Sequence, residues 1–374
     1  MSRLDQVEES ATLRIADLTN ELKKRGKDIL SFSLGEPDFD TPRHIVDAAN
    51  EAMSTGKTHY APSAGIPELR DAIAAKLKND NAIDVTGKDI IVTPGAKQAI
   101  FEACFGVLNK GDEAILLEPS WVSYDACIKM SEAKTVWVKS NEDGSIPADF
   151  GKHITKKTRM VILNSPNNPS GAVLTKKDLQ HVADLAVDHD FYVLSDEIYE
   201  KISYGEKHYS IGSMIPDRTI TVNGFSKAYA MAGWRIGYVT APKPVFKNLL
   251  KVQQHTISSP TTFVQYGALA ALNGSQDCVT EMVKQFKARR DVVMKGLKDI
   301  GLECPTPEGA FYAYPKVDGN SEKIAEGLLD AGVGLTPGSA FGPDSNDHLR
   351  MSYASSMEQI VEGLARMKKY FANQ

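Results

Sequence analysis

The chain has 374 residues, of which 42% are hydrophobic and 24% are charged, a length and composition typical of a globular protein with more than one domain. Its 43 basic and 48 acidic residues give a net charge of −5, which provides no electrostatic footprint for nucleic acid or for an anionic membrane. We therefore expect small-molecule partners and no binding to nucleic acid or membranes.

The N-terminal segment MSRLDQVEES lacks the basic start and apolar core of a signal peptide, and no apolar run approaches the roughly 18 residues that a membrane helix needs. These features predict a cytoplasmic protein. The 4 cysteines lie far apart, and neither they nor the 8 histidines form a metal-binding pattern such as CxxC or HExxH. We expect the cysteines to be buried thiols and predict no metal site.

The first predicted helix, LRIADLTNELKKRG, covers residues 13–26. Between about residues 89 and 241, short apolar runs rich in β-branched residues alternate with helical stretches. These runs are DIIVT, EAILLE, TVWVK, RMVILN, FYVLS, TITVN and RIGYVT. Continuous apolar runs separated by helices indicate a mostly parallel sheet that is covered by helices on both faces. Thr175 and Asp178 fit a capping box, which places the start of one of these helices.

After about residue 244 the pattern becomes helical, with a long amphipathic stretch over residues 276–301. Two strand-like segments, GAFYAYP and HLRMSYA, follow it, and a terminal helix is expected to begin at Ser356. These elements predict a smaller α+β unit beside the sheet. The predicted fold class is therefore α/β with two domains.

Polar residues follow four of the predicted strands at the point where each strand ends. Ala96 and Lys97 follow DIIVTPG, Asn168 follows RMVILNSPN, Asp196 follows FYVLS and Lys227 follows TITVNGFS. Because ligands of open parallel sheets bind beyond the carboxyl ends of the strands, these groups should converge on one crevice. Their convergence supports a functional site more strongly than any one of them does.

Each polar residue also has a purely structural explanation. Asn168 lies in NSPNNPSG, whose Asn-Pro and Ser-Gly pairs are common in turns, and Asp196 in SDEIYE fits a helix N-cap. Lys227 fits an exposed position at a helix start, although a cation there opposes the helix dipole. Arg235 fits an ion pair with a surface carboxylate, an interaction that contributes only about 0–1 kcal/mol.

Six separated segments together resemble the class I aminotransferases, which are pyridoxal 5′-phosphate enzymes of fold type I. They are SLGEPDFDTP, YAPSAGIPELR, NSPNNPSG, SDEIYE, SKAYAMAGWRIGY and HLRMSYA, and the resemblance runs from about residue 10 to the last helix. It implies an N-terminal arm over residues 1–14, a small α+β domain over 15–44 and 281–374, and a large cofactor-binding domain over 45–280. It also implies a homodimer with shared active sites that acts in amino-acid metabolism.

The resemblance assigns five residues to the ring of the cofactor. Lys227 matches the lysine that forms a Schiff base with the cofactor aldehyde and carries the proton between substrate Cα and cofactor C4′. Asp196 matches the carboxylate that keeps the pyridine nitrogen protonated. Asn168 and Tyr199 match the donors to the ring oxygen, and Trp121 in EPSWVSY matches the aromatic residue that stacks on the ring.

A second group of residues is assigned to the phosphate. Arg235 matches the arginine that grips it, a task that suits a planar fork of donors. Ala96 and Lys97 are expected at a helix N-terminus, where backbone N–H groups favour a phosphate. Tyr60 matches a tyrosine that reaches the phosphate from the neighbouring subunit. The chain has Gly224 where many relatives have a serine ligand, so one phosphate contact must come from elsewhere.

Arg350 matches the arginine that clamps the α-carboxylate of the substrate, and Gly35 supplies a close backbone contact nearby. Trp121 and Asn168 are expected to contact the substrate as well as the cofactor. The segment HLRMSYA alternates as a half-buried strand should, which argues against a fully exposed arginine at position 350.

Lys97 resembles a lysine that, in one branch of the aspartate aminotransferases, reaches the side-chain carboxylate of the substrate. Ser10 and Thr12 in ESATLRIADL match the two hydroxyl residues that assist it, and a helix N-cap is the alternative explanation for both. The coincidence of all three favours a dicarboxylate, because a buried cation facing an apolar substrate would be left unpaired. We therefore expect an aspartate aminotransferase that passes the amino group to 2-oxoglutarate in a ping-pong reaction.

Two other functions stay open, and the chain length argues against a third. An aromatic or broad-specificity aminotransferase would share the same motifs, and a pyridoxal-phosphate-dependent lyase or decarboxylase of this fold is excluded by none of these residues. Conversion that depends on a keto acid separates a transaminase from a lyase. A non-catalytic regulator would need a DNA-binding module, for which 374 residues that begin almost at the first family motif leave no room.

Overall fold

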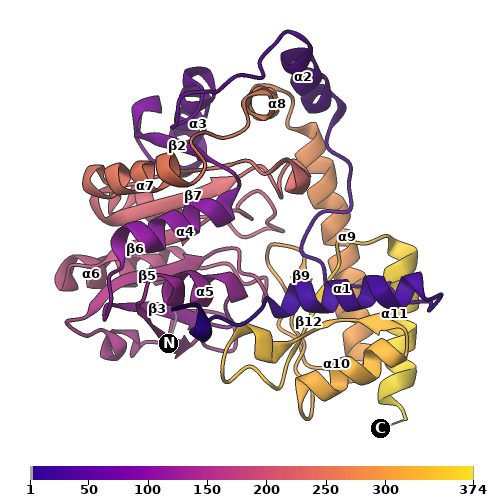
Figure 1. The fold of residues 1–374 in the computed structure, drawn as a ribbon. Coiled ribbons are helices and arrows are strands. Elements are labelled where there is room, and N and C mark those ends of the chain that lie inside the picture. The colour runs from indigo at the N-terminus through magenta and orange to yellow at the C-terminus, as the bar shows by residue number, and fades with distance from the viewer. Residues whose placement is uncertain (1–2, 374) are drawn as a thin grey trace.

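A computed structural model describes residues 3–373 of the chain, apart from the side chains at positions 3, 11–13 and 16. Figure 1 shows a wide sheet enclosed by helices and a smaller C-terminal unit packed beside it. The expected α/β fold class, with a large sheet-containing part and a smaller α+β part, is confirmed.

Seven strands form the main sheet in the order β2-β8-β7-β6-β5-β3-β4. Their bounds are Ile90–Thr93 (β2), Glu113–Glu118 (β3), Lys134–Lys139 (β4), Thr158–Asn164 (β5), Tyr192–Asp196 (β6), Thr219–Gly224 (β7) and Gly237–Thr240 (β8). β8 runs antiparallel to both of its neighbours, whereas the other neighbouring strands are parallel. Each predicted apolar run is therefore a strand of one mostly parallel sheet, with small shifts at the strand ends.

Helices cover both faces of this sheet. On one face, α4 (Ala96–Val107), α5 (Val122–Met130) and α7 (Lys243–Thr256) share a buried apolar cluster with the strands. The other face is covered by α6 (Lys176–His189), α2 (Arg43–Ser54), α3 (Pro67–Asn81) and α8 (Thr262–Asn273). The predicted capping box at the start of α6 is present, because Thr175 Oγ1 accepts a hydrogen bond from the Asp178 backbone N–H at 3.2 Å and Asp178 bonds back.

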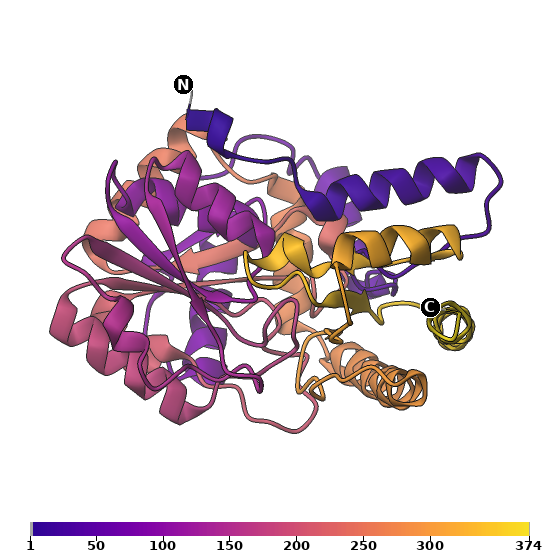
Figure 2. The same cartoon turned by 90° about the horizontal axis from the view of Figure 1, so that it is seen from below.

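The C-terminal unit combines the end of the chain with part of its N-terminal region. α9 (Asp277–Ile300), α10 (Ser321–Asp330) and α11 (Met357–Phe371) pack with an antiparallel sheet of β11 (Thr336–Pro337), β12 (Leu349–Ser352) and β9 (Tyr312–Ala313). α11 follows an N-cap at Ser356, as predicted. β1 (Leu30–Ser31) pairs with β10 (Val333–Gly334), and α1 (Ala11–Lys24) contacts β10 and β11. Figure 2 shows α1, in indigo, alongside the gold helices of this unit.

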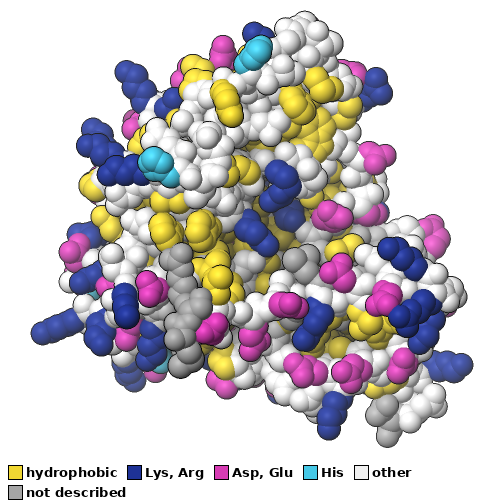
Figure 3. All heavy atoms as spheres, in the orientation of Figure 1, with side chains coloured by type: hydrophobic (Ala, Val, Ile, Leu, Met, Phe, Trp, Pro, Cys, Tyr) yellow, Lys and Arg dark blue, Asp and Glu magenta, His cyan; other side chains and the backbone are white. Residues whose placement is uncertain are grey.

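Short 3₁₀ helices connect several of these elements, at Arg3–Gln6, Gly87–Asp89, Phe150–His153, Ile211–Ser213, Pro216–Arg218, Ala232–Trp234 and Gly338–Phe341. None of the described helices is long and apolar enough to cross a membrane. The space-filling view shows a hollow between the helices around the main sheet and the C-terminal unit, with basic side chains at its edge (Figure 3).

Candidate active site

The polar residues that follow the strand ends converge on one cavity of about 380 Å³. Ala96, Lys97, Asn168, Asp196 and Lys227 all line it, as the positions of their strands predicted. Further lining comes from Trp121 and Tyr124 of the main unit, from Tyr312 and Arg350 of the C-terminal unit, and from Ser33, Gly35 and Glu36 after β1. The cavity therefore lies where the main sheet meets the C-terminal unit.

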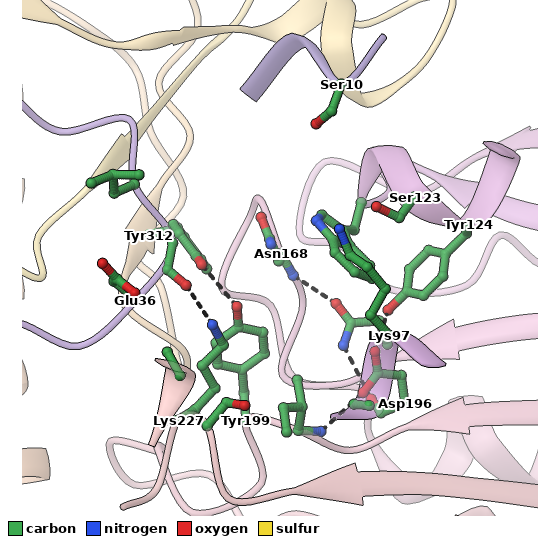
Figure 4. Close-up of a pocket in the computed structure, with 18 of the residues that line it drawn as sticks. Ser10, Glu36, Lys97, Ser123, Tyr124, Asn168, Asp196, Tyr199, Lys227 and Tyr312 are labelled. Carbon is green, nitrogen blue, oxygen red and sulfur yellow. Dashed lines mark hydrogen bonds between the residues drawn. The ribbon is translucent and has the colours of Figure 1, made fainter. Parts of the chain in front are cut away.

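Lys227 lies in a turn directly after β7, and no helix begins there. The explanation that placed it exposed at a helix start is therefore wrong. Its side chain is half-buried, and Nζ donates a hydrogen bond to the carbonyl oxygen of Gly35 (Figure 4). Burial lowers the pKa of Lys227 to about 8, an effect that nearby Glu36 opposes and nearby Arg235 reinforces. A primary amine with this pKa is partly neutral near physiological pH.

Asp196 is the last residue of β6 and is only 3% exposed. Its Oδ2 accepts a hydrogen bond from the Tyr124 hydroxyl at 2.7 Å, and its Oδ1 accepts one from the Ile198 backbone N–H at 3.1 Å. No helix follows, so the N-cap explanation is wrong. Burial raises the pKa of Asp196 to about 6, although both hydrogen bonds favour the carboxylate.

Tyr124 is a site residue that the sequence reasoning missed. The side chain lies on α5, one helical turn after Trp121, and the two rings meet edge to face with their centroids 5.3 Å apart. The available signal was this spacing of three in EPSWVSY, which places both aromatic side chains on one face of a helix that begins at the strand end. The partner of Tyr124, Asp196, is remote in sequence, so the contact itself had no local signal.

Arg350 is 2% exposed, although it carries a charge. Its Nη1 donates to Asn168 Oδ1 at 3.0 Å and its Nη2 donates to the Ser33 carbonyl oxygen, while Nε has no partner among the described residues. Its guanidinium lies 4.8 Å from the ring centroid of Tyr312. No carboxylate of the described chain contacts Arg350. A buried cation without a carboxylate partner is expected where an anionic ligand binds.

Asn168 is more than a turn residue, because its side chain contacts Arg350. Asn168 lies in a turn, as its sequence context indicated, but its side chain is buried and its oxygen accepts from Arg350. The amide nitrogen of Asn168 is then the group that is left as a donor. A residue in the turn after β5 and a strand residue on β12 are thereby joined across the two units.

Tyr199 and Tyr312 both line the cavity, and their hydroxyl groups form a hydrogen bond with the oxygens 2.8 Å apart. Burial, together with this neighbour, raises the pKa of Tyr199 well above its usual value, so the phenol stays protonated and can donate. Gly35 approaches the same pair closely, because a Cβ atom at position 35 would lie 2.5 Å from the Tyr312 hydroxyl. Position 35 therefore requires glycine.

The N-terminus of α4 and Arg235 form an electropositive corner of the cavity. Ala96 and Lys97 begin α4, as predicted, and a Cβ atom at Gly95 would lie 2.7 Å from Arg235 Nη2. Arg235 is exposed and therefore accessible to a ligand. Backbone N–H groups, the helix dipole and a guanidinium together favour an anion here.

The structure gives a reason for glycine at position 224, where many relatives have serine. A Cβ atom at Gly224 would lie 3.0 Å from Gly237 Cα and 3.1 Å from the Ile236 carbonyl oxygen. A serine would therefore press against β8. Ser226, two residues later, lines the cavity instead.

The remaining predicted site residues differ in how the structure places them. Lys97 Nζ lies 5.0 Å from the centroid of the Trp121 ring, within the cavity. Ser10 stands at the N-cap position of α1 and also lines the cavity (Figure 4). The side chain of Thr12 lies outside the described residues. Tyr60 is 90% exposed and does not line the cavity of its own chain.

The whole chain is similar to known proteins. A family model described as aminotransferase class I and II matches residues 27–367. The chain is 42% identical to a probable aspartate aminotransferase of Methanocaldococcus jannaschii over 99% of both chains. It is also 42% identical to an aspartate/prephenate aminotransferase of Thermus thermophilus, over 98% of this chain and 97% of that protein. A solved structure of aspartate aminotransferase from Thermus thermophilus with maleate superposes with a TM-score of 0.95, at 41% identity and 99% coverage of both chains.

Proposed function

The chain belongs to the class I and II aminotransferases, and we propose that it transfers the α-amino group of aspartate to 2-oxoglutarate. The observation that carries this proposal is a pair of cations, Lys97 from α4 and Arg350 from β12, which line one cavity. Among the described residues, no carboxylate contacts either of them. Two cations without carboxylate partners suit a substrate with two carboxylates, such as aspartate, glutamate or their keto acids.

We propose pyridoxal 5′-phosphate as the cofactor, because the donor set of the cavity fits this molecule. The half-buried amine of Lys227 suits the aldehyde, the buried carboxylate of Asp196 suits a protonated pyridine nitrogen, and the electropositive corner at Ala96 and Arg235 suits the phosphate. When bound, this cofactor supplies an electron-withdrawing ring that takes up the electron pair released at the substrate Cα.

Four residues would set the orientation and electronic state of the ring. Asp196, held as a carboxylate by Tyr124, would keep a proton on the pyridine nitrogen. Tyr199, whose hydroxyl remains protonated, would donate to the ring oxygen together with the amide nitrogen of Asn168. Trp121, which is the N-cap residue of α5 and lines the cavity, would cover the face of the ring.

Lys227 would move the proton of the reaction. Its lowered pKa leaves a fraction of the amine neutral near pH 7, and a neutral amine could accept the proton from the substrate Cα and release it toward C4′ of the cofactor. Arg350 would hold the α-carboxylate, so that the Cα–H bond points toward Lys227 Nζ. The pairing of Arg350 with Asn168 ties this orientation to the ring contacts.

The lowered pKa of Lys227 predicts how cofactor capture depends on pH. Apoenzyme mixed with pyridoxal 5′-phosphate should capture it covalently at a rate that rises with pH, with a midpoint near 8. The reason is that only the neutral amine is nucleophilic, and an ordinary lysine stays mostly protonated up to about pH 10.4. The rate is measured by quenching with borohydride at intervals and quantifying the modified peptide. A midpoint near 10 would contradict the assigned environment of Lys227.

We also propose a homodimer in which Tyr60 of one subunit completes the phosphate site of the other. Tyr60 is 90% exposed in the single chain, although a tyrosine side chain is largely apolar, and this exposure supports a position at an interface. The family resemblance assigns the same role to this tyrosine.

The shared site predicts complementation between two inactive variants. Tyr60→Ala and Lys227→Ala proteins should regain part of the wild-type activity after subunit exchange, because each hybrid dimer has one site with both defects and one intact site. Activity is measured before and after exchange, and exchange itself is followed with a size tag on one variant. Proven exchange without recovered activity would show that each subunit works alone.

We further propose the domain division into an arm (residues 1–14), a small domain (15–44 and 281–374) and a large domain (45–280). In its support, most of the buried cluster around Phe311 and Tyr353 comes from the C-terminal unit, and this cluster is separate from those on the two faces of the main sheet, although Ile198, Tyr199, Ile202 and Tyr204 of the main unit also belong to it. The boundary after residue 280 falls in the first turn of α9, so α9 would connect the two domains.

A panel of amino acids tests the proposed substrate. Each is added to the purified holoenzyme without a keto acid, and the change in cofactor absorbance reports transfer of the amino group. Aspartate and glutamate should react fastest. Equal or faster reaction of phenylalanine or tyrosine would favour the aromatic or broad-specificity alternative, for which the name of the aspartate/prephenate relative gives a precedent. Product formation without stoichiometric amino transfer would point to a lyase or decarboxylase.

A further inference from the structure

Glu118, the last residue of β3, joins the main sheet to the C-terminal unit. Its Oε1 accepts hydrogen bonds from the Asp344 backbone N–H and from the Ser345 hydroxyl, both at 2.7 Å. Close by, the Ser120 backbone N–H donates to the Phe341 carbonyl oxygen at 2.8 Å. These five residues, Glu118, Ser120, Phe341, Asp344 and Ser345, are called the Glu118 clamp below.

The loop of the clamp fits closely onto the carboxylate. A Cβ atom at Gly342 would lie 2.3 Å from Glu118 Cδ and from Oε1, so a side chain at position 342 would push the loop away. Glu118 is 3% exposed and Ser345 is 5% exposed, which leaves the contact largely free of bulk water. The loop therefore rests directly on the end of β3.

Stability alone does not account for a glutamate at this position. Burying a carboxylate is costly unless a cation pairs with it. Burial raises the pKa of Glu118, and Lys139, its register partner on β4, opposes this effect, but no lysine or arginine of the described chain lies within ion-pair distance of Glu118. The carboxylate is instead satisfied by two donors from a loop of the other unit. A residue that is costly to bury and that joins two units is expected to serve their relative placement.

The two sides of the clamp carry two groups that a substrate must touch together. On the side of the main sheet, Trp121 directly follows Ser120 and lines the active-site cavity. On the other side, the ring centroid of Phe341 lies 5.0 Å from the guanidinium of Arg350. The clamp thus lies between the residue proposed to cover the cofactor ring and the residue proposed to hold the α-carboxylate.

The clamp also spans a region where the two units are otherwise separated. Glu118 and Ser345 do not line the active-site cavity, but they line a second cavity of about 1190 Å³. Its other walls come from the region after β4 in the main unit and from the end of α9 in the C-terminal unit. Beside this cavity, the hydrogen bonds of Glu118 are direct contacts between the two units.

We propose that Glu118 is a positioning residue that sets the spacing between Trp121 and Arg350. This inference rests on the proposed function, because it assumes that a substrate bridges these two residues. Without the clamp, the units spend less time in the arrangement that binds substrate, and the apparent affinity falls by the fraction of molecules that remain competent. Chemistry in the bound complex and cofactor binding at Lys227, Asp196 and Arg235 do not depend on the clamp.

The test compares Glu118→Ala with Glu118→Gln in the holoenzyme. Glu118→Ala should raise KM for the amino acid and for the keto acid by roughly three- to tenfold, with kcat within about twofold of wild type. Glu118→Gln keeps an acceptor oxygen for both donors and should restore a KM close to that of wild type. Glu142→Gln removes an exposed carboxylate from the wall of the same second cavity and serves as the matched control, with no expected change.

A second variant keeps the test decisive if Glu118→Ala folds poorly. Ser345→Ala removes one donor and leaves Glu118 in place, and by itself it should raise KM by about two- to threefold. Where Glu118→Ala does fold, adding Ser345→Ala to it should produce no further increase, because both changes break the same contact. The visible circular dichroism of the bound cofactor should stay unchanged in all variants. A fall in kcat with unchanged KM, loss of cofactor from Glu118→Ala, or full additivity with Ser345→Ala would overturn the proposal.

The design separates this inference from the proposed substrate. If aspartate is not the substrate, wild-type enzyme alone reveals it in the amino-acid panel. The clamp is then tested with the amino acid that reacts fastest, because Arg350 is proposed to hold the α-carboxylate that every α-amino acid has. If the proposal for Glu118 is wrong, this shows only in the ratio of the KM values of variant and wild-type enzyme, whichever amino acid is the substrate.

Discussion

Lys227→Ala is expected to lose nearly all aminotransferase activity while it continues to bind pyridoxal 5′-phosphate. The substitution removes both the amine that attaches the cofactor and the base that moves the substrate proton, and a general acid–base group alone contributes about 10²- to 10⁴-fold. Arg235, the N-terminus of α4 and Asp196 remain in place to hold the cofactor. Turnover of aspartate and the cofactor content after gel filtration are the two measurements.

Lys227→Arg is the matched control, because it keeps the positive charge next to the Gly35 carbonyl but offers no neutral amine near pH 7. It should be as inactive as Lys227→Ala. Borohydride reduction of wild-type holoenzyme should attach the cofactor to the peptide that contains Lys227. Attachment to a different lysine, or substantial turnover by either variant, would rule out the role assigned to Lys227.

Much of the fold and the location of the site could be predicted from local sequence patterns. The apolar runs became neighbouring strands because each one buries side chains on both faces of a sheet, and the capping box at Thr175 marks the start of α6. Ala96, Asn168, Asp196 and Lys227 then had to converge, since parallel strands place their carboxyl ends at the same edge. The convergence follows from strand direction alone.

The side-chain partners could not be predicted in this way. Asp196 was compatible with a helix N-cap, but its carboxylate bonds to Tyr124, a residue of α5 that lies 72 positions earlier in the sequence. Arg350 bonds to Asn168 across 182 positions of sequence. Such pairs depend on how two units pack, and periodicity within one segment carries no information about that packing.

The burial of Glu118 in the clamp also could not be predicted from the sequence. In the sequence, Glu118 is the last residue of the predicted strand EAILLE, and nothing in that run indicates whether its carboxylate is exposed or buried. Its burial comes from a loop that begins more than two hundred positions later and that approaches through Gly342. A charged residue at a strand end is therefore ambiguous until the element that covers it is known.

Lys97→Met is expected to lower kcat/KM for aspartate and glutamate by roughly ten- to a hundredfold, because it removes a charge-assisted contact of about 1.5–3 kcal/mol. Lys97 is placed for such a contact, since its ammonium lies 5.0 Å from the Trp121 ring centroid and has no carboxylate partner among the described residues. Burial and nearby Arg235 lower its pKa, which means that the cation is destabilised until an anion binds. Methionine keeps an unbranched apolar stem over the ring, so the loss should come from the charge.

The informative quantity is the ratio between substrates, since alanine and phenylalanine have no distal carboxylate for Lys97 to bind. The kcat/KM values for alanine and phenylalanine should change little in Lys97→Met, because Arg350 and the cofactor contacts remain. Lys97→Ala should show the same selectivity between substrates, with some added loss because alanine no longer packs on Trp121. Ser10→Ala tests the second predicted contact and should produce a smaller loss for the dicarboxylates only. An equal loss for every amino acid, accompanied by weaker cofactor binding, would place Lys97 on the phosphate instead, because a phosphate contact at the start of α4 serves all substrates alike.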